Sequence, residues 1–135
     1  ITADATLTAA SHAGRTMVLS VASGATLTLP AASGTGNIYK FFVATTITSN
    51  NYIVQVANGN DTMAGVAIVA NDGGDTASIF ETAADSDTIT LNGTTTGGIL
   101  GGVVEIQDVA TNVFSVVSRG AATGSEATPF SAAVS

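Results

Sequence analysis

A single histidine, a few aspartates and several glycine-rich loops are the only features of this 135-residue chain that suggest chemistry. A hydrolytic triad needs a nucleophile, a base and an orienting acid, and His12 is the one candidate for the base. Ser11 precedes His12 directly, and adjacent side chains on an extended chain point to opposite faces. The pair therefore does not form a nucleophile and its base. We predict a surface histidine, no catalytic residue and no enzymatic activity.

Two pairs of aspartates lie close together in the sequence, Asp85 with Asp87 and Asp72 with Asp75. On a strand, Asp85 and Asp87 would face the same side and could share a calcium ion. Aspartate also caps turns by accepting hydrogen bonds from its own backbone, which explains both pairs without a ligand. No EF-hand spacing accompanies them, and the chain has no cysteine. The sequence predicts no metal site and no cofactor.

Glycine-rich segments occur at residues 33–37 (SGTGN) and 92–102 (NGTTTGGILGG). A phosphate-binding P-loop ends in Gly-Lys-Ser/Thr and opens a helix. Neither segment contains lysine, and the second leads into the alternating sequence VVEIQ. What is left is a long loop that presents Ile99 and Leu100 between glycine pairs. These two residues either fill the core of their own domain or contact a neighbouring chain.

Charge limits the classes of partner. The formal net charge is −7, and the only basic residues are Arg15, Lys40 and Arg119. Binding to nucleic acid needs a basic stripe that displaces counterions from phosphates, and three scattered cations do not make one. The same shortage disfavours anionic membranes. We therefore expect neither nucleic acid nor a membrane as a partner.

Alternation of apolar and polar residues dominates the segments that must position these groups. It predicts inward-facing side chains in several short strands, and turn signals separate these strands at intervals typical of a sandwich or barrel. The inward-facing residues are Met17, Leu19 and Val21, Leu27 and Leu29, Ile89 and Leu91, Val104 and Ile106, and Phe114 and Val116. We predict an all-β fold, an antiparallel β-sandwich or barrel in a single domain, with Gly/Thr/Asn-rich loops and little or no helix.

One strand differs from the others. In the segment IYKFFVA, the side chains of Tyr39, Phe41 and Val43 share an apolar face, and the opposite face is interrupted only by Lys40. This strand is expected to contact protein on both sides, so we predict an intersubunit face at Tyr39, Phe41 and Val43, with ordinary core packing as the alternative. Residues 77–85 are the best helical candidate, but a loop or an edge strand fits them equally well.

The final residues form a separate compositional unit. We predict a β domain over residues 1–119 and a C-terminal arm over residues 120–135, which is built of small residues apart from Pro129 and Phe130. Such an arm is either disordered or docks its one aromatic side chain on a neighbour.

Residues 27–69 (LTLPAASGTGNIYKFFVATTITSNNYIVQVANGNDTMAGVAIV), residues 85–117 (DSDTITLNGTTTGGILGGVVEIQDVATNVFSVV) and the ending GSEATPFSAAVS carry a resemblance. They resemble the small head decoration, or cement, proteins of tailed bacteriophages. The resemblance implies a β-rich virion protein, commonly a homotrimer, which sits on the outer capsid surface and clamps neighbouring copies of the major capsid protein. Tail fibres use similar LPA and NGTTTGG turns, so a tail-fibre or receptor-binding β domain that recognises a host surface is the alternative.

These interpretations predict a set of interface residues. Small side chains carry much of the chain and bury little apolar area, so burial against a partner would add stability. For the interface we select Ile99 and Leu100 in the long loop, Pro129 and Phe130 in the arm, and the face of Tyr39, Phe41 and Val43.

Overall fold

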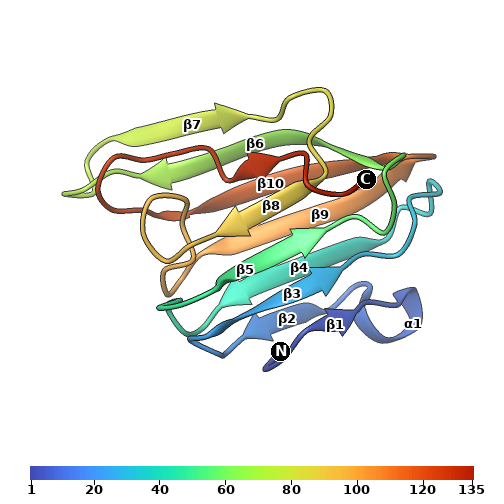
Figure 1. Cartoon of the computed structure of the whole chain (residues 1–135), viewed down its shortest axis with the longest axis horizontal. Helices are drawn as coiled ribbons and strands as arrows, with labels where there is room; N and C mark the ends of the chain where they lie inside the picture. The colour runs from blue at the N-terminus through green and yellow to red at the C-terminus, as the bar shows by residue number, and fades with distance from the viewer.

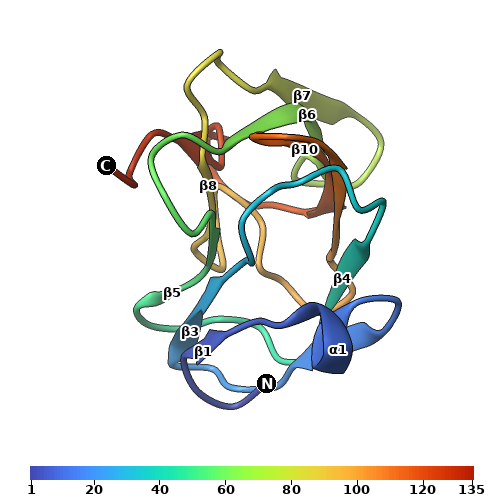
Figure 2. The ribbon, with the colours of Figure 1, turned by 90° about the vertical axis from the view of Figure 1, so that its right-hand side faces the viewer.

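The computed structural model describes residues 1–135 as two β-sheets packed face to face, with one four-residue helix, α1 (Ala9–His12) (Figures 1 and 2). The five-stranded sheet has the order β1 (Ala5–Thr6), β3 (Gly24–Thr28), β5 (Asn51–Gln55), β8 (Thr88–Leu91) and β11 (Phe130–Ser131). The six-stranded sheet has the order β2 (Thr16–Leu19), β4 (Ile38–Val43), β9 (Val103–Ala110), β10 (Val113–Ala121), β6 (Thr62–Ala70) and β7 (Ala77–Glu81).

The predicted β class is confirmed, but the purely antiparallel arrangement is wrong. Both sheets are mixed, and β1–β3, β3–β5, β2–β4 and β6–β10 pair in parallel. Along the first half of the chain, consecutive strands alternate between the two sheets. Each time the chain returns to a sheet it runs in the same direction as before. For this reason β3 lies parallel to β1, β4 to β2 and β5 to β3. Neither sheet closes on itself, so the molecule is a sandwich and not a barrel.

The two sheets face each other in Figure 2, and a cluster of 23 buried apolar residues forms the core between them. Strand alternation brings one face of each sheet inward. The inward-facing residues predicted from the alternation are buried here, with Leu19, Leu27 and Ile106 fully buried. The exception is Val21, which follows the end of β2 and is half-buried against the core. These confirmed strands position the outward-facing residues considered below.

Three buried carboxylates hold the loops on this core. Asp87 accepts hydrogen bonds from the backbone N–H groups of Ala133 (2.8 Å) and Val134 (3.1 Å). Asp61 accepts one from Ala32 N (3.0 Å). The Asp108 carboxylate accepts hydrogen bonds from backbone N–H groups of the loop before β4. Because buried polar groups are costly unless they are hydrogen-bonded, these aspartates fix loops that have little apolar area of their own.

Two local elements differ from the pattern-based expectation. Residues 77–85 contain no helix, and the edge-strand alternative holds, because Ala77–Glu81 forms β7. The only helix, α1, follows Thr8, whose Oγ1 accepts a hydrogen bond from Ser11 N (3.3 Å). No helix in the chain has the length and apolarity to cross a membrane.

Candidate protein-binding surface

The outer face of the six-stranded sheet carries large apolar side chains in register. The cross-strand pairs place one outward-facing residue from each strand in a row, which reads Val18, Phe42, Val103, Arg119, Ile68 and Ile79. The next row reads Thr16, Lys40, Glu105, Val117, Val66 and Glu81. We call these two rows the six-strand face.

Several side chains of the six-strand face are open to solvent. Val18 is 44% exposed, Ile68 and Val117 are 39% exposed, and Ile79 is 65% exposed. With strands about 4.8 Å apart and rows about 7 Å apart, the face covers roughly 400 Å². Seven of its twelve side chains are apolar, and the largest apolar surface of a monomer is often functional.

Charge also separates the six-strand face from the remaining surface. It holds two of the three basic residues, Lys40 and Arg119, and two acidic ones, Glu81 and Glu105. The face is therefore formally neutral, and the whole net charge of −7 lies on the rest of the chain. A partner that approaches this face meets no excess of either charge on the face itself.

The predicted intersubunit residues on β4 lie on the other side of the strand. Tyr39 is 2% exposed, and Phe41 and Val43 are fully buried in the core. These three side chains have no surface left for a partner. The structure moves the candidate surface on this strand from Tyr39, Phe41 and Val43 to the opposite face, where Phe42 is half-buried and Ile38 is 37% exposed. The apolar residues on both faces of the segment IYKFFVA indicate a second apolar face on this strand.

The long loop before β9 is folded onto the domain and exposes one of its two aliphatic side chains. Asn92 Oδ1 accepts hydrogen bonds from Thr94 N (2.9 Å) and Thr96 N (3.1 Å), and Ile47 N donates to Gly98 O (3.0 Å). Ile99 is half-buried, whereas Leu100 is 62% exposed. Gly101 N donates to Val43 O (2.9 Å), which places Leu100 at the end of the six-stranded sheet where β4 ends.

The C-terminal residues selected from the sequence pack against their own domain. Phe130 is 7% exposed and belongs to the core cluster, and Pro129 is also buried. Phe130 pairs with Ile89 across β8 and β11, and β10 extends to Ala121, two residues into the predicted arm. Residues 120–135 thus complete the sandwich of their own chain, and Phe130 fills its own core.

The residues considered for chemistry are dispersed and serve local structure. His12 Nδ1 accepts a hydrogen bond from Thr8 N (2.9 Å) at the helix cap. Asp87 is buried at the C-terminal segment, while Asp85 is exposed. Asp72 accepts a hydrogen bond from Gly124 N (3.2 Å). His12, Asp72 and Asp87 therefore each accept a hydrogen bond from the backbone of their own chain.

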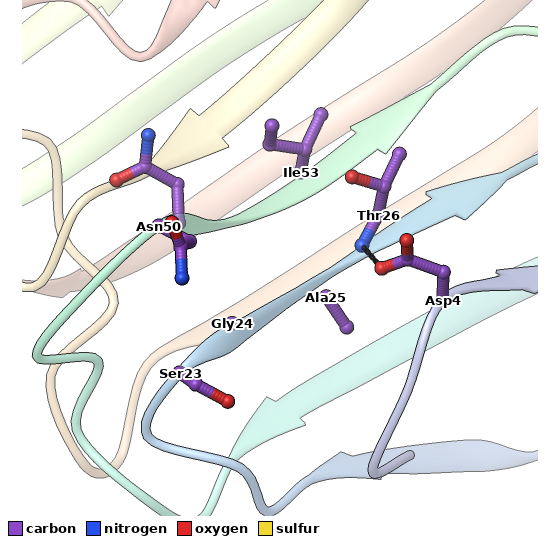
Figure 3. Close-up of a pocket in the computed structure, with 8 residues that line it drawn as sticks. Asp4, Ser23, Gly24, Ala25, Thr26, Asn50 and Ile53 are labelled. Carbon is purple, nitrogen blue, oxygen red and sulfur yellow. Dashed lines mark hydrogen bonds between the residues drawn. The ribbon is translucent and has the colours of Figure 1, made fainter.

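A shallow polar pocket of about 390 Å³ lies on the outer side of the five-stranded sheet (Figure 3). Asp4 accepts a hydrogen bond from Thr26 N (2.7 Å) there, and Asn50, Asn51 and Ser23 supply further polar groups. Asp4 is the only charged residue in the lining, and no aromatic residue contributes to it. The pocket offers hydrogen bonds to a polar ligand but no ring on which a sugar could stack.

No protein-family profile matches this sequence, and neither a curated protein nor a solved structure shows significant similarity to it.

Proposed function

We propose that this chain is a non-enzymatic structural protein of a bacteriophage particle, which binds the outer capsid surface and stabilises contacts between major capsid proteins. The observation that carries the proposal is the six-strand face, a formally neutral surface with seven apolar side chains on an acidic protein. The sequence resemblance to head decoration proteins supplies the identity of the partner, and the face supplies a surface on which to bind it.

The physical argument concerns the contacts between neighbouring capsid subunits in the shell. Packaged DNA presses outward on a shell, and a protein that bridges neighbouring capsid subunits adds buried area where the lattice contacts are weakest. A specific interface needs about 800 Å² per partner. The six-strand face supplies about half of that area, and Leu100, at the end of the same sheet, extends it. No reaction is required for this role.

The proposal includes a homotrimer, with a particle mass of three times 13.2 kDa. Light scattering of the purified chain measures this mass directly. The alternative of a receptor-binding domain would use the polar pocket at Asp4 and Asn50. We favour the capsid because that pocket lacks aromatic side chains, whereas the six-strand face exposes several large apolar side chains together.

The double substitution Val18→Thr and Val117→Thr is expected to weaken capsid binding by about 10- to 100-fold, because each new hydroxyl loses its water in the interface without gaining a partner. Threonine keeps the shape and the strand preference of valine, and both positions are exposed. The melting temperature should therefore stay close to that of the wild type. Co-sedimentation with capsids stripped of the chain measures the occupancy.

Ile53→Thr is the matched control. Ile53 is a half-buried β-branched residue in β5, on the outer side of the five-stranded sheet. The Ile53→Thr substitution removes apolar surface from the outer face of the five-stranded sheet. It should leave capsid occupancy unchanged. Equal occupancy for the double variant and the wild type would contradict the proposal, as would an equal loss in the control.

A further inference from the structure

The four edges of the two sheets are not equally protected. Exposed edge strands present unpaired N–H and C=O groups, and proteins usually shorten, charge or cover them. In the five-stranded sheet, the edge strands β1 and β11 are two residues long. In the six-stranded sheet, residue Ile1 covers the edge of β2, because its amino group donates to Val18 O (2.6 Å) and its carbonyl accepts from Ser20 N (3.2 Å).

The remaining edge, β7, has no such protection. It pairs with β6 on one side over five residues, Ala77 to Glu81, and Figure 1 shows no strand beyond it. Its sequence, ASIFE, contains neither proline nor lysine, and its pairing with β6 shows no bulge. Ile79, at its centre, is 65% exposed. An edge of this kind is a ready template for one more strand.

A cavity of about 580 Å³ adjoins this edge. Its apolar wall comes from Phe80 of β7, Ala83 in the following loop, and Phe130 and Ala132 near the C-terminus. It therefore lies where the edge of one sheet approaches the edge of the other, at β11. A strand added to β7 would continue the alternation of side chains, so that every second side chain would turn toward this cavity.

The charge around the cavity selects the occupant. Glu81 and Asp85 line it, and no basic residue does. A second copy of the chain, paired through its own β7, would bring both carboxylates of each copy to one shared edge, together with Asp75 from each β6–β7 turn. Repulsion between these carboxylates would oppose association of two copies. A segment with lysine or arginine would meet opposite charge instead.

We propose that β7 and its adjoining cavity accept an extended segment of a partner protein, which adds to the six-stranded sheet as a further strand. The segment seats one bulky apolar side chain in the cavity and places a basic residue beside Glu81 and Asp85. This inference goes beyond the proposed function, because the site lies at the edge of the sheet and needs no capsid. The site shares Ile79 and Glu81 with the six-strand face, but it uses the free backbone edge of β7, and peptide binding tests it without capsids.

A blocked heptapeptide tests the proposal. It carries a central phenylalanine between two valines, an arginine outside each valine and a threonine at each end. Added at millimolar concentration to the ¹⁵N-labelled full chain, it should shift amide resonances in β7, in residues 82–87 and in residues 128–132. The same peptide with N-methyl groups on all of its internal residues should cause no shifts, because neither of its edges can then donate to a strand ladder.

A protein variant tests the charge requirement. Glu81→Gln combined with Asp85→Asn keeps the shape of the cavity and should lower the peptide affinity about tenfold at low salt. The matched control, Asp72→Asn, removes a carboxylate that lies outside the cavity lining and should leave the affinity unchanged. Absence of shifts, shifts away from β7, or equal binding of the N-methylated peptide would overturn the proposal. Shifts in β7 that depend on protein concentration without peptide would identify a second copy as the occupant and also overturn it.

Discussion

The substitution Gly65→Ala is expected to lower the free energy of unfolding by about 3 kcal/mol or more, which corresponds to a fall of roughly 10 °C in melting temperature for a chain of this size. Gly65 lies opposite Val116 in the parallel pair β6–β10, and a Cβ there would lie 1.8 Å from the Val116 carbonyl oxygen. The obstructing atom belongs to the backbone, so no change of rotamer relieves the clash. The two strands must move apart.

Gly74→Ala separates this close approach from backbone strain. Gly74 has a φ of +74°, and a Cβ there would meet nothing within 4 Å. The control should cost about 1 kcal/mol, from the left-handed backbone conformation alone. Thermal and urea denaturation of both variants gives the comparison. Similar losses in the two variants would contradict the close packing of β6 on β10.

The parallel pair β6–β10 also carries the centre of the six-strand face. Val117 lies opposite Val66, and Arg119 lies opposite Ile68. Separation of these strands would break both rows of the face. If the face binds the capsid, Gly65→Ala should reduce capsid occupancy as well as stability, whereas Gly74→Ala should affect neither strongly.

The inward faces of the strands were predictable because alternation is a local property. Leu27 and Leu29, or Val104 and Ile106, repeat every second residue, and a strand with one buried face requires that period. The IYKFFVA segment also signalled two apolar faces. Its pattern did not tell which face turns inward, because Tyr39 and Phe42 lie on opposite faces and both are apolar. Burial of Tyr39 at 2% exposure settles it.

The strand pairing was not predictable in the same way. Alternation does not reveal which strand lies beside which, and parallel neighbours such as Thr16 and Lys40 are far apart in the sequence. The six-strand face forms only when residues from six strands come into register, so no single segment of the sequence predicts it. Phe130 illustrates the same limit. A lone aromatic residue in a small-residue segment suggested an arm, but pairing with Ile89 places it in the core.

Asp108→Asn is expected to lower the free energy of unfolding at neutral pH by about 2 to 4 kcal/mol. Asp108 is 3% exposed. Its carboxylate accepts hydrogen bonds from the Thr35 hydroxyl (2.6 Å) and from the backbone N–H groups of Ser33, Gly34 and Thr35 (2.7 to 3.2 Å). Asparagine offers one acceptor oxygen and turns its NH₂ group toward donors. The loop at residues 33–37, which leads into β4, would lose its anchor.

The pH dependence of the stability shows whether Asp108 holds the loop through its negative charge or only through packing contacts. Burial raises the pKa of Asp108, but the hydrogen bonds from Thr35, Gly34 and Ser33 lower it by more, so the net pKa lies below the usual value. A carboxyl group whose folded pKa is depressed adds stability above its unfolded pKa of about 3.9, and this stability is lost as the pH falls toward the folded pKa. The wild-type advantage over Asp108→Asn should therefore stay constant from about pH 7 to 5 and shrink below about pH 4.

Urea denaturation at several pH values measures this difference, and subtraction of the variant removes the titration of the other acids. Thr35→Val is the control, because it deletes the 2.6 Å hydroxyl donor and leaves the backbone donors in place. It should cost about 1 kcal/mol and keep most of the acid dependence. A wild-type advantage that did not change with pH would show that the pKa of Asp108 is the same in the folded and unfolded chains. The negative charge of Asp108 would then add nothing to the hold on this loop, which would rest on packing and on hydrogen bonds that need no charge.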